Sequence, residues 1–324
     1  MEQTLSPRLD LTQFSAQVRQ IKDEIARVVV GHNQVVDLLL AAILADGHVL
    51  LEGVPGVAKT LLARLTARLI DSRFSRIQFT PDLMPSDVLG TTVFNMKSSE
   101  FDFHEGPIFA NMVLVDEINR APAKTQAALF EVMEERQVSI DGTTHHMEEP
   151  YTIIATQNPV EQEGTYKLPE AQLDRFMFKI VMGYPTLQQE VTILQRHQAN
   201  ARLAKLEDIT PIITKDALLA LRDYMKMVMV DDSLLGYIAN IVQQTRMSKA
   251  VLLGASPRAS VTMLQGAKAI ALIQGRDFVT PDDIKIVAPS VLNHRIIISA
   301  EAEMQGYTVN RIVATLVDNV EVPK

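Results

Sequence analysis

The sequence predicts an α/β protein in which helices cover both faces of a parallel sheet, followed by a smaller all-helical domain. In the first half, helical stretches alternate with continuous apolar runs such as HVLLE, MVLVDE and YTIIATQ. Strands that are apolar on both faces are typical of a parallel sheet between two helix layers. Beyond residue 183, helical periodicity replaces these runs. We therefore expect an α/β domain over residues 1–183 and a helical domain over residues 184–324.

The composition indicates an acidic, folded protein without disulfide bonds. The chain has 324 residues, of which 47% are hydrophobic and 5% aromatic, and its formal net charge is −8 at pH 7. This balance disfavours nucleic acid as a partner, because such binding relies on basic surface and aromatic stacking. The sequence contains no Cys, no apolar signal segment and no run long enough to span a membrane. We expect a cytoplasmic protein with no membrane segment.

The first strand, expected over residues 49–52, leads into a candidate phosphate-binding loop. The sequence GVPGVAKT at residues 53–60 matches the pattern G-x-x-x-x-G-K-S/T, except that Ala58 replaces the second glycine. A helical leucine pattern follows, and we expect Ala58 to be already entering that helix. On this segment alone, an ordinary Gly-Pro turn with a solvated lysine is the alternative.

The chemistry of such a loop depends on its backbone. Successive N–H groups at a helix N-terminus bind anions, and glycine supplies the unusual backbone angles that this arrangement needs. Lys59 would reach the outer phosphates of a nucleotide, and Thr60 would ligate Mg²⁺. The residues expected to bind the nucleotide are Gly53, Val54, Pro55, Gly56, Val57, Ala58, Lys59, Thr60 and Leu61.

Two segments interrupt the α/β pattern. The segment at residues 86–110 is too long for a simple connection. Within residues 136–149, Val138 and Ile140 alternate into an Asp-Gly turn, which predicts a β-hairpin. Insertions on such a sheet are commonly functional.

Two acidic residues end the apolar run that follows residues 86–110. Asp116 and Glu117 come directly after MVLV. Because the carboxyl ends of parallel strands meet at one edge of the sheet, we expect the pair to face the phosphate loop. Asp116 would hold Mg²⁺ through water, and Glu117 would polarise the attacking water. A solvated acidic turn is the alternative, and the phosphate loop upstream disfavours it.

Three further polar residues are candidates for the same site. Asn158, at the end of the run in YTIIATQNP, is suited to orient a water, although plain Asn-Pro turn chemistry explains it equally well. Arg175 precedes a strand, where an ion pair with Asp174 or Glu170 is the simplest interpretation. Arg258 lies in the first turn of a helix, where the helix dipole disfavours a cation. A nearby anion, either a nucleotide or a carboxylate, would account for it.

Two predicted helix N-termini in the second half of the chain agree with the expected helical domain. Ser256 and Thr280 stand where N-caps are expected, and each is followed by a proline, Pro257 or Pro281, at the first helical position. This order of residues is typical of a helix N-terminus.

Together these motifs resemble those of AAA+ ATPases, and specifically of the MoxR family in the helix-2-insert clade. The resemblance covers nearly the whole chain and rests on VVVGHNQVV, GVPGVAKT, VLVDEINRAPAKTQAALFEVMEERQVSIDG, ATQNP, LPEAQLDRF and GASPRA. Phosphate loops of this family carry Ala before the lysine, so Ala58 agrees with a working site. The resemblance implies an αβα sandwich with a P-loop and an all-α lid.

The resemblance also implies roles for individual residues. Val30 and Gly31 would border the adenine of ATP. Asp116 and Glu117 would form the Walker B pair, and Asn158 would be sensor 1.

Two arginines and both inserted segments also have counterparts in the family. Arg175 would be the arginine finger that completes a neighbouring subunit's site, and Arg258 would be sensor 2. Residues 86–110 would be the helix-2 insert, and the hairpin within residues 136–149 would be the pre-sensor insertion.

For the function, the resemblance implies an ATPase that hydrolyses ATP with Mg²⁺ and assembles into a homo-oligomeric ring, usually hexameric. Its work would be chaperone-like remodelling or maturation of protein clients, including metal or cofactor insertion, often on proteins with a von Willebrand factor A domain. A nucleic-acid motor and an ATP-gated scaffold without turnover are the alternatives. The acidic charge disfavours the first, and Glu117, Asn158 and Arg175 disfavour the second.

Overall fold

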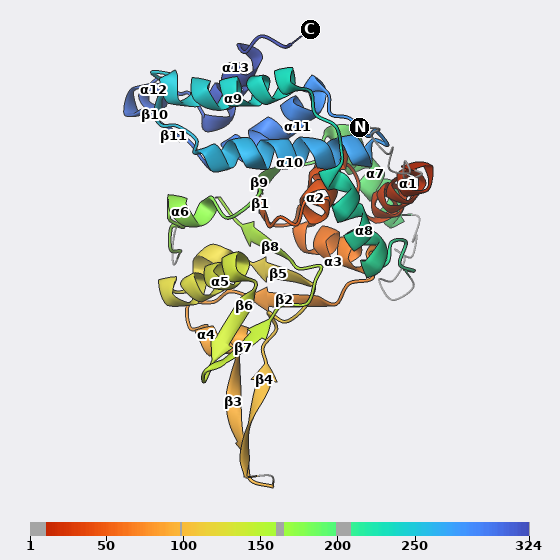
Figure 1. The fold of residues 1–324 in the computed structure, drawn as a ribbon, viewed down its shortest axis with the longest axis vertical. Coiled ribbons are helices and arrows are strands. Elements are labelled where there is room, and N and C mark those ends of the chain that lie inside the picture. Colours follow the sequence, from red (N-terminus) through yellow and green to blue (C-terminus); the bar gives the residue numbers. More distant parts are fainter. Residues whose placement is uncertain (1–10, 98, 160–164, 199–208, 324) are drawn as a thin grey trace, which may run out of the picture.

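The structure, a computed structural model, describes residues 11–97, 99–159, 165–198 and 209–323. A five-stranded sheet forms the centre of the first domain, with strand order β2-β5-β8-β1-β9 and parallel pairing throughout (Figure 1). Its strands are β1 (Val49–Gly53), β2 (Phe74–Gln78), β5 (Met112–Asp116), β8 (Thr152–Gln157) and β9 (Phe178–Met182). The predicted parallel sheet is confirmed.

The central strands β1, β5 and β8 carry apolar runs because alternate side chains enter two different cores. In β1, Val49 and Leu51 belong to the core that continues into the helical domain, whereas Leu50 belongs to the core on the opposite face. Leu114 and Val113 of β5 divide in the same way. This division is the physical reason for the continuous runs in the sequence.

Helices cover both faces of this sheet. Helices α1, α2 and α3 pack in the first core, and α4 and α5 pack in the second. The helices of the first domain and of the segment after it are α1 (Leu11–Val28), α2 (Asn33–Leu44), α3 (Lys59–Leu69), α4 (Pro85–Leu89), the 3₁₀ turn η1 (Ile118–Arg120), α5 (Ala123–Glu135), α6 (Glu170–Leu173) and α7 (Leu187–Gln198).

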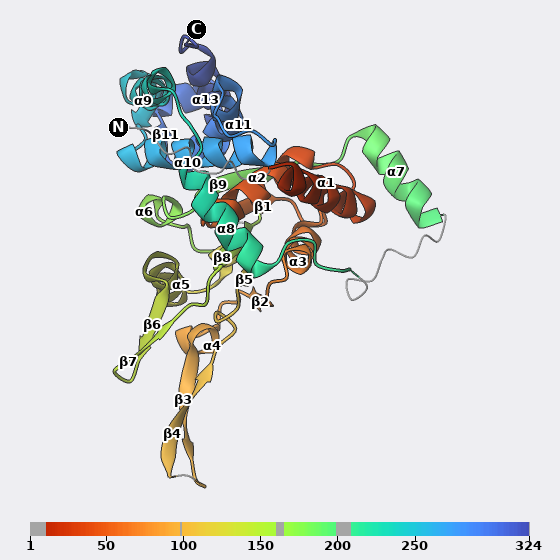
Figure 2. The same ribbon diagram turned by 45° about the vertical axis from the view of Figure 1, so that its right-hand side comes forward.

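Two antiparallel hairpins project from the edge of the domain that faces away from the helical domain (Figure 2). One consists of β3 (Gly90–Asn95) and β4 (Glu100–Glu105), within the long segment after α4. The other consists of β6 (Gln137–Ile140) and β7 (Thr143–His146). In its turn, Asp141 and Gly142 both have positive φ angles, of 50° and 81°. An Asp-Gly pair is favoured there because both central residues of a type I′ turn need positive φ.

The second domain is helical, with one small addition that the sequence did not reveal. Its helices are α8 (Lys215–Lys226), α9 (Asp232–Met247), α10 (Pro257–Ile273), α11 (Pro281–Leu292), α12 (Ala300–Met304) and α13 (Val309–Asp318). The addition is an antiparallel pair of very short strands, β10 (Val251–Leu253) and β11 (Ile297–Ile298). No helix in the described ranges is both long and apolar enough to cross a membrane.

The two expected helix caps differ from each other. Thr280 and Asp283 form a capping box at the start of α11, as the sequence order predicts. Ser256 occupies the N-cap of α10, but its side chain forms no capping hydrogen bond. Pro257 at the first helical position therefore predicts the start of α10 better than Ser256 does.

A glycine of α10 lies against the edge strand β9 of the sheet. A Cβ atom added to Gly266 of α10 would lie 2.8 Å from Cζ of Phe178 in β9. The Phe178 side chain is fully buried, so its ring has no free space into which to move. Gly266 thus allows α10 to pack directly on the end of the sheet.

Replacing Gly266 by Ala is expected to lower the free energy of unfolding by about 1 to 3 kcal/mol, as overpacked cores do. Gly236 of α9 is the matched control, because a Cβ there would meet no atom within 4 Å. Gly236→Ala should instead raise stability by about 0.5 to 1 kcal/mol through helix propensity. Urea unfolding measures both changes, and equal stability of the two variants would contradict this account of the packing.

Candidate functional site

The loop between β1 and α3 curls at the carboxyl end of the sheet. Gly56 has a φ angle of 87°, a conformation that glycine adopts without strain. Ala58 is the N-cap of α3 in the left-handed conformation, with φ 62° and ψ 24°. Ala58 thus stands at the entrance of the helix, where its carbonyl oxygen accepts the hydrogen bond of Leu62 N–H, but its own backbone is left-handed rather than helical. The loop needs one more left-handed residue before the helix begins, which is why the general pattern has glycine there.

The lysine of the loop folds back over it. The Lys59 ammonium donates a hydrogen bond to the carbonyl oxygen of Gly53. The first residue of the pattern is thereby tied to the first residue of α3. This contact holds the curl of backbone whose N–H groups would surround an anion.

Asp116, at the end of β5, lies directly opposite the loop. The hydroxyl of Thr60 is 3.5 and 3.4 Å from the Asp116 oxygens Oδ1 and Oδ2. The Thr156 hydroxyl donates to Oδ1 at 3.1 Å, and Arg76 Nε donates to Oδ2 at 2.7 Å. The carboxylate is almost fully buried, so these contacts replace the water it would otherwise hold.

Glu117 follows in a left-handed conformation, with φ 56°, that turns the chain at the strand end. Gln78 Nε2 donates to its Oε2 at 2.9 Å, and Arg120 Nε lies 3.0 Å from the same oxygen. Its backbone N–H donates to the Thr156 hydroxyl at 3.0 Å. Thr156 therefore orients both acidic residues.

These groups line one cavity of about 380 Å³. It is lined by Pro55, Gly56, Ala58, Lys59, Thr60, Leu61, Arg76, Gln78, Asp116, Glu117, Thr156 and Asn158. The structure thus brings together the phosphate loop, the acidic pair and Asn158, which the sequence places far apart. A cavity of this size, with a few convergent polar groups, is typical of a small-ligand site.

Three residues of this cavity were missed by the sequence analysis. Arg76 and Gln78 alternate along β2, and Gln78 is in register with Asp116 in the neighbouring strand. Thr156 lies on β8, on the other side of β5. The signal that could have found them is the strand order, because polar residues at the ends of adjacent strands meet at one edge.

Five predicted nucleotide-binding residues lie outside the lining of this cavity, namely Gly53, Val54 and Val57 of the loop, and Val30 and Gly31 ahead of α2. Val30 and Gly31 precede α2, and Gly31 has a φ angle of 81°. A Cβ on Gly31 would lie 2.6 Å from Nε2 of Gln189 in α7, so the side chain of that residue lies over the glycine. Their contact with adenine stays a prediction.

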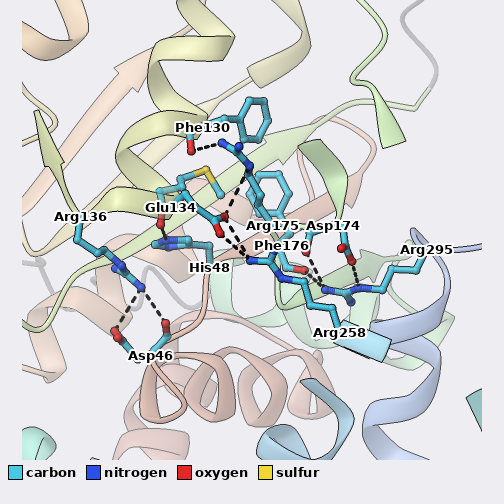
Figure 3. A network of polar contacts seen from close by, with 11 residues as sticks. Asp46, His48, Phe130, Glu134, Arg136, Asp174, Arg175, Phe176, Arg258 and Arg295 are labelled. Carbon is cyan, nitrogen blue, oxygen red and sulfur yellow. Dashed lines mark hydrogen bonds and ion pairs between the residues drawn. The ribbon is translucent and has the colours of Figure 1, made fainter. Parts of the chain in front are cut away.

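Arg175 and Arg258 line a second cavity, of about 240 Å³ (Figure 3). Both contact Glu134 of α5. Arg175 Nε is 3.7 Å from Glu134 Oε2, and Arg258 Nη2 donates to the same oxygen at 3.2 Å. Arg175 also donates to the carbonyl oxygen of Phe130. Neither arginine lines the cavity that holds Lys59.

The alternative explanation for Arg175, an ion pair with Asp174 or Glu170, does not hold in the structure. Asp174 pairs instead with Arg295, at 2.6 Å, and Glu170 pairs with Lys167, at 3.6 Å. The anion expected near Arg258 is a carboxylate of the same chain. Sequence proximity misled here because Arg175 turns towards α5 rather than along its own segment.

Arg295, in the turn just after α11, ties the helical domain to the segment that carries Arg175. It donates to the carbonyl oxygens of Asp174, Phe176 and Met177 at 3.0, 2.8 and 3.2 Å. Burial lowers the pKa of this guanidinium, and the carboxylate beside it opposes that shift. Because its side chain is only 2% exposed, the pair is shielded from solvent and fixes the geometry.

A second buried group supports the same region. His48 accepts a hydrogen bond at Nδ1 from the backbone N–H of Ile153, so its Nε2 carries the proton and donates to the carbonyl oxygen of Met133. Burial, with Arg136 nearby, lowers the pKa of His48 to about 3. The neutral ring therefore joins the start of β1 to the end of α5.

The fold and the first cavity define the class of protein. A P-loop at the carboxyl end of a parallel sheet, opposite an acidic strand end and followed by a helical domain, is the architecture of an AAA ATPase. Residues 48–178 match the model of the ATPase family associated with various cellular activities, and residues 243–316 match the AAA lid domain. The α/β fold with a helical lid is confirmed.

Comparison with individual proteins defines the family. The chain is 48% identical over 301 residues to YeaC of Bacillus subtilis, covering 93% of each. It is 44% identical over 310 residues to Chaperone MoxR1 of Mycobacterium tuberculosis, covering 93% of this chain and 81% of that one. A crystal structure of a candidate ATPase from Cytophaga hutchinsonii matches with a TM-score of 0.88 and 42% identity over 97% of each chain. The chain belongs to the MoxR family of AAA+ ATPases, and it hydrolyses ATP.

Proposed function

We propose that this ATPase works as a homo-oligomeric ring, hexameric as is usual for its family, and uses Mg-ATP hydrolysis for chaperone-like remodelling of a protein client in the cytoplasm. One observation carries the ring assignment. Arg175 and Arg258 lie outside the cavity of their own chain that contains Lys59 and Glu117. Cations of the arginine-finger type must touch a γ-phosphate to act, so these two would serve the nucleotide of a neighbouring subunit.

Within one subunit, the loop would bind ATP together with Mg²⁺. Thr60 and Asp116 offer a hydroxyl and a carboxylate to the same space, and these are the oxygen donors that Mg²⁺ prefers. The donor set therefore fits the ion, which when bound would neutralise phosphate charge. Lys59 would leave Gly53 for the outer phosphates. Arg76 would add a second cation from the adjacent strand, since it already faces Asp116.

The hydrolysis step would depend on Glu117 and Asn158. Both line the cavity, from the ends of two adjacent strands. Gln78 and Arg120 hold one carboxylate oxygen of Glu117, which leaves the other to accept a hydrogen bond from the attacking water. Asn158 would orient that water, and Val30 with Gly31 would border the adenine.

The client is proposed to be a protein with a von Willebrand factor A domain, matured by metal or cofactor insertion or by complex remodelling. The family resemblance implies this class, and the relative named Chaperone MoxR1 supports chaperone work. We place the contact on the β3–β4 hairpin. Phe94 and Phe101 are cross-strand partners with ring centroids 5.1 Å apart, and Met96 near the tip is 88% exposed.

Charge indicates what this hairpin would bind. Glu100 and Asp102 are exposed on either side of Phe101 along β4, and their side chains point to the opposite face of the hairpin from the aromatic pair. A hairpin with exposed acidic and apolar side chains repels nucleic acid and anionic membranes, whereas it attracts a protein segment with basic and apolar side chains. This favours a protein client over the nucleic-acid motor.

Capture of the client tests two proposals, that the assembled ring retains a protein client and that the β3–β4 hairpin contacts this client. Glu117→Gln with Mg-ATP should hold the ring assembled and retain the client. Adding Phe94→Ser and Phe101→Ser should weaken capture at least about tenfold, a loss of about 1.4 kcal/mol, without changing assembly. Lys97→Ser on the same hairpin is the control. Undiminished capture by the double variant would overturn the hairpin assignment, and ATPase stimulation by DNA would favour the motor.

A further inference from the structure

Glu134 joins two arginines that come from different domains (Figure 3). Its Oε2 atom is 3.7 Å from Arg175 Nε and 3.2 Å from Arg258 Nη2, and its Oε1 atom is 3.4 Å from the same Nη2. Arg175 precedes β9, whereas Arg258 lies in the first turn of α10 in the lid. One carboxylate on α5 therefore contacts two cations that come from separate parts of the chain.

Electrostatics explains why this carboxylate is needed. The two guanidinium groups repel each other, and the dipole of α10 further disfavours the cation in its first turn. The side chains of Glu134, Arg175 and Arg258 are 40%, 31% and 49% exposed. Ion pairs this exposed add little to folding stability, because solvent screens them. Folding stability therefore explains the contacts of Glu134 poorly. The placement of the two arginine side chains explains them better.

Arg175 is held by contacts from α5 and from Arg295. Phe130, one turn earlier on α5, accepts a hydrogen bond from Arg175 through its carbonyl oxygen, and its ring centroid lies 6.0 Å from the guanidinium carbon. Arg295 holds the backbone on the other side of Arg175. Arg175 is thus fixed by two elements, while Glu134 is the contact that aligns Arg258 with it.

We propose that Glu134 is a positioning residue that holds Arg175 and Arg258 side by side for the phosphates of the nucleotide on the neighbouring subunit. The inference rests on the proposed function, in which both arginines act across the ring interface. Each guanidinium has five N–H donors, so contact with one carboxylate leaves donors for a phosphate. Preorganised cations stabilise transition-state charge without reorganising at the moment of reaction.

The test separates turnover from binding. Glu134→Ala should lower kcat for ATP about tenfold and leave KM within about twofold, because the nucleotide cavity of the same chain is untouched. Glu134→Gln keeps an acceptor oxygen without the charge and should have an intermediate kcat. Glu135→Ala, an exposed carboxylate on the same helix, is the matched control and should keep the kcat of the unchanged protein. Thermal unfolding should give the same midpoint for all three.

A double-mutant cycle decides whether Glu134 acts through the arginines. Adding Glu134→Ala to Arg258→Ala should cost less than about twofold further in kcat if the two act as a unit. Full additivity, an unchanged kcat in Glu134→Ala, or a raised kcat would overturn the inference. If Arg175→Ala itself retains full turnover, the proposed function fails. If Arg175→Ala loses turnover while Glu134→Ala does not, only the inference about Glu134 fails.

Discussion

Lys59→Ala is expected to abolish ATP binding, whereas Glu117→Gln is expected to bind ATP with nearly unchanged affinity and hydrolyse it at least about 10²-fold more slowly. In the proposed mechanism Lys59 reaches the phosphates from the loop, so its loss would remove binding energy in the ground state as well as the transition state. Glu117 would act on the attacking water and not on the nucleotide, and an amide in its place cannot accept the proton of that water. Titration with a fluorescent ATP analogue and steady-state phosphate release measure the two effects.

Two exposed residues provide controls for this pair. Lys226→Ala and Glu131→Gln change the same residue types on helix surfaces away from the cavity, and both should match the unchanged protein. Removing Mg²⁺ with EDTA should stop hydrolysis in every variant. Thr60 and Asp116 would be ligands of the ion, and neither side chain can replace its positive charge. Undiminished turnover in both Lys59→Ala and Glu117→Gln would refute the assignment of this cavity as the ATPase site.

Much of the fold and the first cavity was predictable because the signals are local. The run at residues 49–52, the glycines around Pro55 and the leucines of α3 are contiguous, and their order fixes a strand, a loop and a helix. Asp116 was predictable for a related reason. Once the sheet is parallel, every strand end lies at the same edge, so an acidic strand end must approach the loop.

The contacts that were missed join residues distant in sequence. Arg175 pairs with Glu134 rather than with its neighbour Asp174, and Arg295 reaches Asp174 from the lid. No periodicity encodes such pairings, because they depend on how α5 and α11 are placed in space. The pair β10–β11 was missed for another reason, since strands of 3 and 2 residues are too short to show alternation.

Arg175→Ala is expected to lower kcat about 10³-fold, the lower range for arginine fingers, with little change in ATP binding. The reason is spatial. In its own chain Arg175 lines a different cavity from Lys59, so its charge would meet only the phosphates of an adjacent subunit. Steady-state phosphate release and analogue binding, each measured at concentrations that keep the ring assembled, give the two quantities.

Mixing two inactive variants distinguishes action between subunits from action within one. Lys59→Ala subunits keep Arg175 but bind no ATP, and Arg175→Ala subunits bind ATP but lack the arginine. Where the two alternate around a ring, an intact Arg175 faces a filled nucleotide site, so the mixture should hydrolyse ATP faster than the sum of its components. A mixture of Lys59→Ala with Glu117→Gln is the control and should stay inactive, because no interface then combines bound ATP with an intact Glu117. If co-assembly is verified and the first mixture gains nothing, Arg175 does not act across the interface, and the ring assignment loses the observation on which it stands.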